Sequence, residues 1–112
     1  MTGLNHEEVI RRTTSIQEQR FDATVGFMGS SYPQVGPDTT LATLQQEFEI
    51  LSQETGISVL ILEVIGSMHF QVKLAERENR TYDPRMGMSK DTEKELKKLG
   101  FTIPNPTFRF GH

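Results

Sequence analysis

The sequence has 112 residues but no cysteine, no tryptophan and only three histidines. Without cysteine the chain has no disulfide bond, no thiolate metal ligand and no cysteine nucleophile. The histidines stand far apart and share no spacing typical of metal ligands; they are His6, His69 and His112. We therefore expect neither a metal nor another cofactor.

Longer patterns are missing too. No apolar run reaches the roughly 20 residues that span a membrane, and the first residues lack the basic and then apolar segments of a secretory signal. We therefore expect a cytoplasmic protein without a membrane partner. The sequence also holds no G-x-S-x-G, H-E-x-x-H or Gly-rich phosphate-binding motif, so the common hydrolase and nucleotide-binding classes have no support.

A strong charge of one sign is absent as well. The formal net charge is −3, made up of −5 in residues 1–56 and +2 in residues 57–112. The positive charge of the second half is too small for a dedicated nucleic-acid-binding protein. The opposite net charges of the two halves do, however, permit association between protein surfaces. At this length we expect a single domain, 1–112.

The most apolar part of the sequence lies in its middle. Residues 57–65 are almost all β-branched or aliphatic, a composition typical of strands. Residues 68–75 alternate between apolar and polar side chains, which predicts a strand with one buried face. Gly66 and Ser67 between them have the composition of a tight turn. These features predict a β-hairpin over residues 57–76.

The register of this hairpin is open. With a two-residue turn, Glu63 interrupts an apolar row on the first strand. With a three-residue loop and a bulge, Glu63 lies on the polar face near Gln71. A slip of one residue exchanges the two faces, so the sequence permits both.

Helices are predicted on either side of the hairpin. Asn5, with Glu8 three residues later, has capping-box spacing and begins a polar helix within residues 1–20. An apolar stripe at helical spacing predicts a second helix over residues 40–55, ended by Gly56; the stripe consists of Leu41, Leu44, Phe48 and Leu51. A short helix begins at Ser89 or Asp91 and ends before Gly100.

The remaining segments are less regular. Residues 21–28 fit both a strand and a helix, and their poor helix formers favour the strand. Residues 29–39 and 77–89 are expected as long loops, and residues 101–103 and 107–110 as an interrupted strand. The expected fold is therefore a small α+β two-layer sandwich with a mostly antiparallel sheet. If 21–28 is a strand, the order after the N-terminal helix is the ferredoxin-like β-α-β-β-α-β.

Three groups of side chains are candidates for a function. Weak acid–base candidates are Glu63, His69 and Asp83. The arginines of the second loop are candidates for binding a phosphate or carboxylate; they are Arg77, Arg80 and Arg85. Apolar residues of the hairpin and the loop form a candidate protein interface; they are Leu60, Leu62, Val64, Met86 and Met88.

These observations favour a non-enzymatic interaction domain: an accessory subunit, regulator or inhibitor that forms a homodimer or binds another protein. The motive is the first strand of the hairpin, which is apolar on both faces and so needs a cover on each. The first alternative is an anion-binding or hydrolytic protein that uses the 77–89 loop. The second is nucleic-acid binding through the lysine-bearing 90–99 helix, which is disfavoured because acidic residues interleave with the lysines.

Overall fold

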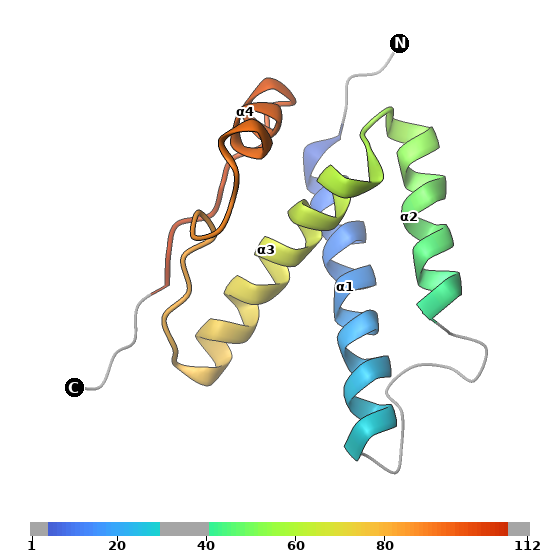
Figure 1. Ribbon diagram of the computed structural model, residues 1–112, viewed down its shortest axis with the longest axis vertical. Coiled ribbons are helices and arrows are strands. Elements are labelled where there is room, and N and C mark those ends of the chain that lie inside the picture. The colour runs from blue at the N-terminus through green and yellow to red at the C-terminus, as the bar shows by residue number, and fades with distance from the viewer. Residues whose placement is uncertain (1–4, 30–40, 108–112) are drawn as a thin grey trace.

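The computed structural model describes residues 5–29 and 41–107, with residues 25–29 described by their backbone alone. Four helices make up most of these residues: α1 (His6–Gly29), α2 (Leu41–Thr55), α3 (Val59–Glu78) and α4 (Lys90–Lys98). Helix α3 lies in the middle. Helices α1 and α2 pack on one side of it, and α4 with its flanking segments lies on the other (Figure 1).

The expected α+β fold is wrong. Across residues 5–29 and 41–107 the protein is helical and has no strand; a single antiparallel bridge joins Tyr82 to Thr107. Residues 21–28, expected as a strand, continue α1, and residues 101–103 have no regular structure. Neither a ferredoxin-like order nor an antiparallel sheet is therefore present there. Gly29, expected in the first long loop, ends α1, while residues 30–39 of that loop and residues 108–110 of the last expected strand lie outside the described residues.

The predicted β-hairpin is also wrong, because residues 59–78 form the continuous helix α3. Ser58 caps it, since its hydroxyl accepts a hydrogen bond from the Ile61 backbone N–H, 3.3 Å away. β-Branched residues cost a helix only some tenths of a kcal/mol each, whereas full burial of an aliphatic side chain contributes roughly 1.5–3 kcal/mol. Burial on several faces of α3 therefore outweighs strand propensity; its buried residues are Ile61, Leu62, Ile65, Gly66, Met68, Phe70, Leu74 and Ala75.

Gly66, predicted as part of the turn, lies inside α3 where α1 crosses it. A Cβ added at Gly66 would overlap the carbonyl oxygen of Thr13 and stand 2.7 Å from its carbonyl carbon. Glycine is therefore required for the close approach of two helix backbones, not for a positive φ. Next to this crossing the side-chain amide of Gln17 donates to the carbonyl of Glu63, at 3.0 Å.

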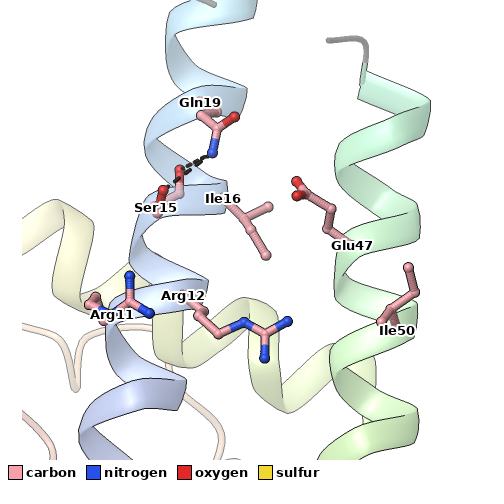
Figure 2. Close-up of a pocket in the computed structure, with 7 residues that line it drawn as sticks. All are labelled: Arg11, Arg12, Ser15, Ile16, Gln19, Glu47 and Ile50. Carbon is pink, nitrogen blue, oxygen red and sulfur yellow. Dashed lines mark hydrogen bonds between the residues drawn. The ribbon is translucent and has the colours of Figure 1, made fainter. Parts of the chain in front are cut away.

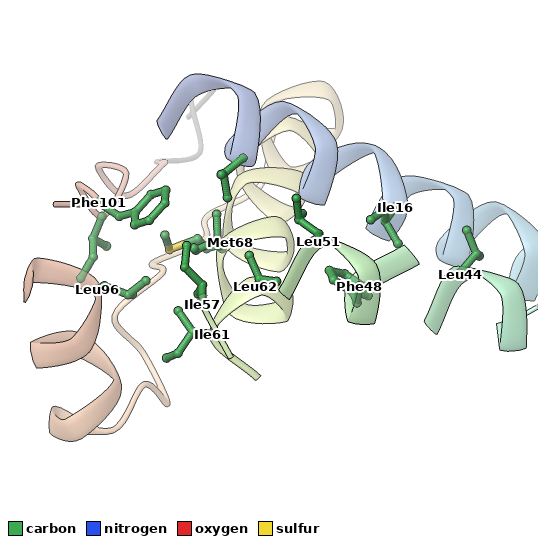
Figure 3. Packing of buried hydrophobic residues seen from close by; sticks show 13 residues of the cluster. Ile16, Leu44, Phe48, Leu51, Ile57, Ile61, Leu62, Met68, Leu96 and Phe101 are labelled. Carbon is green, nitrogen blue, oxygen red and sulfur yellow. The ribbon is translucent and has the colours of Figure 1, made fainter. Parts of the chain in front are cut away.

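The core extends from this crossing in two directions (Figure 3). On the α2 side, Leu44, Phe48 and Leu51 of the predicted stripe are fully buried, whereas Leu41, at the first position of α2, is exposed. Arg20 of α1 ties the three helices together there: it pairs with Glu63 of α3 at 2.8 Å, donates to Gln45 of α2 at 2.6 Å and covers the ring of Phe48. On the other side, Met68 and neighbouring residues of α3 pack against α4; the buried residues there include Leu96, Phe101 and Ile103.

Several predicted helix ends are confirmed. The Asn5 side chain accepts from the Glu8 N–H at 3.0 Å, and Ser89 caps α4 by accepting from the Thr92 N–H at 3.1 Å. Gly56 and Gly100 follow α2 and α4 with φ of 77° and 88°, the left-handed conformation that suits glycine after a helix. Capping residues thus predict the ends of the surface helices, although the secondary structure of the central element was predicted wrongly.

The α4 region is fastened to the start of α1 by His6. Its Nε2 donates to the Leu99 carbonyl oxygen at 2.7 Å, and its ring meets Phe101 edge-on with centroids 4.6 Å apart. A Cβ at Gly100 would lie 2.9 Å from the same Nε2, so the ring sits directly on the glycine. His6 therefore holds the segment after α4 against the rest of the core.

Within the described ranges, no single helix is both long and apolar enough to cross a membrane. Helices α2 and α3 together reach that length and composition, but they bend by 112° at their junction.

Replacing His6 with Ala should loosen the α4 region. The lost hydrogen bond and aromatic pair together contribute about 1–3 kcal/mol to the free energy of unfolding. We expect a loss of that size in chemical denaturation and faster amide hydrogen exchange in residues 96–103. The control His6→Phe keeps the ring and should recover part of the loss. Unchanged exchange in the Ala variant would show that His6 does not fasten this region.

Candidate functional site

The segment between α3 and α4 is ordered by its own hydrogen bonds. Asn79 ends α3 in the left-handed conformation, with φ 52°. Tyr82 then forms two backbone hydrogen bonds with Thr107, at 3.3 and 2.8 Å. The Asp83 carboxylate accepts from the Arg85 N–H at 3.0 Å, and the Asp83 carbonyl accepts from the Met86 N–H at 3.0 Å. These turns hold the loop at a fixed place beside α3.

The loop and α3 enclose a groove of about 380 Å³, which we call the methionine groove. Three of the five methionines of the chain line it. The full lining consists of Val64, Ser67, Met68, Tyr82, Pro84, Met86, Gly87, Met88, Ser89 and Thr92. Met68 is buried against the core, whereas the Met86 side chain is 79% exposed. Flexible, polarizable thioethers make such a surface adaptable to different apolar partners.

An exposed apolar ridge continues the groove along α3. Leu60 is 67% exposed and lies one helical turn before Val64, on the same face of the helix. Leu60 and Met86 are the two most exposed of the large apolar side chains in the described part of the chain. Leu62, by contrast, points into the core and is fully buried. Of the five predicted interface residues, Val64, Met86 and Met88 thus line one groove, Leu60 is exposed one turn before Val64, and Leu62 lies inside.

Tyr82 sits in the wall of the methionine groove. Burial raises the pKa of its phenol, and the neighbouring Asp83 carboxylate adds to this rise, while Arg80 opposes it. The phenol therefore stays protonated at neutral pH and supplies an O–H donor in a lining that also contains the hydroxyls of Ser67, Ser89 and Thr92.

The three acid–base candidates lie apart. The Glu63 carboxylate pairs with Arg20, whereas His69 lies six residues further along α3, where it faces α1 at another level. The Asp83 carboxylate accepts from a backbone N–H within its own turn. Each of these side chains is thus placed by a local structural role, and the structure does not bring them to a common point.

The three arginines predicted to bind an anion do not share one environment. Arg80 donates to Glu78 at 2.8 Å and to Gln71 at 3.1 Å, so its guanidinium is largely occupied. Arg77 and Arg85 are exposed. On α4 the lysines Lys90, Lys94, Lys97 and Lys98 are exposed beside Asp91 and Glu93, and Lys97 contacts Glu93 at 3.5 Å.

A second, smaller groove of about 240 Å³ lies between α1 and α2 (Figure 2). Residues of α1 line it together with Glu47 and Ile50 of α2, and Arg12 and Ile16 point toward α2, whereas Gln19 bonds to Ser15 of its own helix. The pair between Arg12 and Glu54, at 2.8 Å, joins the two helices next to the groove. Its lining is mostly charged and polar, which makes it a weaker candidate for an apolar partner.

A third cavity, of about 470 Å³, opens between α1 and α3. We call it the His69 cavity; it is lined by Ile10, Arg11, Thr14, Ser15, Glu18, His69, Val72 and Lys73. Burial lowers the pKa of His69 below its ordinary value of 6.5, so the imidazole is neutral at pH 7. Sequence patterns do not reveal this cavity, because Thr14 and His69 come to line one cavity only through the packing of α1 against α3.

Residues 5–29 and 41–107 contain no group of three or more His, Asp or Glu side chains placed to hold a metal ion. A comparison with known proteins finds no matching family, no similar curated sequence and no matching solved structure. The function is therefore argued from the geometry of this chain.

Sequence reasoning missed part of the methionine groove. Ser67 and Met68 were assigned to a turn and a strand, so their place beside Val64 on one helix face was not foreseen. Tyr82 and Pro84 were predicted in a loop, but their position beside α3 was not predicted. A helical reading of residues 59–78 would have placed Leu60, Val64 and Ser67 in one stripe, because they repeat at four and three residues.

The pH dependence of stability tests the burial of His69. Because the pKa of His69 is lower in the folded protein, acid protonates the unfolded chain first, and stability falls as the pH drops through the unfolded value of 6.5 toward the lower folded pKa. The charged groups around it are Arg11 and Glu18 of α1 and Lys73 of α3. Denaturation midpoints at several pH values should show a shallower fall in His69→Gln than in the parent. Equal slopes in the two proteins would contradict this assignment.

Proposed function

We propose that the protein is a non-enzymatic interaction module that self-associates through the methionine groove and the adjoining ridge of α3. The observation that supports this most is the exposure of Leu60 and Met86, 67% and 79%, on either side of partly buried Val64 and Met88. Exposed apolar residues that gather on one face are typical of interaction sites, whereas isolated ones are common on any protein.

The shape of this face suits a second copy of the chain. A twofold dimer requires one surface to be complementary to itself. Here a protruding side chain, Leu60, stands beside a hollow lined by Met68, Met86 and Met88. The ridge of one copy fits the groove of the other, and the same contact is then made twice.

Apolar burial at this contact contributes to the free energy of association. Covering Leu60 and Met86 contributes roughly 2–4 kcal/mol for each copy, in proportion to the apolar area removed from water. The phenol of Tyr82 and the hydroxyl of Thr92 at the groove supply polar contacts around the apolar centre.

A non-enzymatic role agrees with the placement of the polar candidates. The carboxylates of Glu63 and Asp83 and the guanidinium of Arg80 already serve hydrogen bonds and ion pairs that stabilise the fold. A catalytic group needs instead a partner within hydrogen-bond reach and access to a substrate.

The double variant Leu60→Ser, Met86→Ser should dissociate the dimer. We expect light scattering over a concentration series to give a doubled mass for the parent at high concentration. The variant should need a protein concentration at least about 700-fold higher, because each of the two copies lacks roughly 2 kcal/mol or more of apolar burial, about 4 kcal/mol for the dimer.

The matched control is Leu41→Ser, Ile50→Ser, which removes two side chains of similar exposure, 55% and 52%, outside the methionine groove. This control should dimerise as the parent does. A parent that stays monomeric at every concentration, or a loss of association in the control alone, would overturn the proposal.

A further inference from the structure

Two buried polar atoms of the His69 cavity have no hydrogen-bond partner among the residues that the structure describes: Thr14 Oγ1 and His69 Nε2. Thr14 is only 7% exposed. A buried polar atom without a partner costs about 1–3 kcal/mol, so folded proteins rarely keep one without a reason. Here two such atoms come from two different helices and line the same cavity.

The neighbouring Thr13 shows that the arrangement of Thr14 is unusual. The Thr13 hydroxyl donates to the Val9 carbonyl at 2.7 Å, the common bond of a threonine inside a helix. Thr24, further along α1, makes the same bond to Arg20 at 2.9 Å. The Thr14 hydroxyl is thus free to bond with a group that enters the cavity.

The rest of the lining indicates what could enter. Ile10 and Val72 provide apolar walls, one from each helix. Three charged side chains stand at the rim: Arg11, Lys73 and Glu18. Arg11 is paired with Glu8, and the Lys73 ammonium is paired with Glu18 at 3.8 Å. Two cations against one carboxylate leave the lining with one net positive charge, which favours an anion.

We propose that the His69 cavity binds a small aliphatic carboxylic acid. One carboxylate accepts two hydrogen bonds, from the Thr14 hydroxyl and from His69 in the tautomer that carries its proton on Nε2, and the net positive charge of the rim favours the anion. The aliphatic chain lies between Ile10 and Val72. The volume of about 470 Å³ falls in the range of small-molecule sites.

The binding test uses the full chain and three probes of equal length: hexanoate, hexanol and hexylamine. Titration calorimetry should show saturable binding of hexanoate, at least about tenfold tighter than hexanol, because hydrogen bonds to a charged group are roughly twice as strong. Hexylamine should not bind. In NMR spectra hexanoate should shift the ring signals of His69 but not those of His6, which contacts Leu99 instead.

The residue-level test is Thr14→Val, which removes the hydroxyl and keeps the shape of the side chain. We expect hexanoate affinity to fall about tenfold, while thermal stability is kept or increased because the unpartnered hydroxyl is gone. Thr24→Val, on the same helix but with an exposed and partnered hydroxyl, is the control and should bind as the parent does.

Three results would overturn the proposal: no saturable binding of hexanoate to the parent, equal affinities for hexanoate and hexanol, or full affinity in a folded Thr14→Val variant. The NMR shifts of His69 do not depend on any variant, so the proposal stays testable if Thr14→Val folds poorly.

Discussion

The close approach of α1 and α3 at Gly66 is the constraint on which the rest of the structure depends. With no Cβ at this position, the Thr13 carbonyl group lies against the backbone of α3. Both helices are then near enough for Arg20 to reach Glu63 and for Gln17 to reach the backbone beside it. Around this crossing α3 packs against α1 and α2 on one side and against α4 on the other, while Leu60 remains exposed.

The sequence predicted the surface helices better than the central one. Helix α2 has a single apolar stripe, and α4 has a serine cap and a terminal glycine, so local rules were enough for both. Helix α3 is apolar on several faces because it is packed on several sides, and such a segment has no clear period. Its Gly66-Ser67 pair has the composition of a turn, which led to the wrong prediction. The glycine is explained instead by a backbone contact with Thr13, 53 positions earlier in the chain.

Most residues of the candidate site were predicted from the sequence, but the secondary structure that carries them was not. Val64, Met86 and Met88 were expected in a shared interface, and they do line one groove, because apolar side chains in a polar loop tend to find apolar cover. The expected β-hairpin would have placed Leu60 and Leu62 on the same face; a helix places Leu60 outside and Leu62 in the core. The His69 cavity depends on a crossing that no local pattern encodes.

The free energy of unfolding of Gly66→Ala tests the crossing most directly. At an uncrowded position inside a helix, this substitution stabilises by about 1 kcal/mol, because alanine is the better helix former. Here the new methyl group would meet the backbone of Thr13, so we predict a loss of roughly 1–3 kcal/mol. Ser67→Ala, one residue later and facing the groove, should be neutral or slightly stabilising. A stabilised Gly66→Ala variant would contradict the packing of α1 on α3 described above.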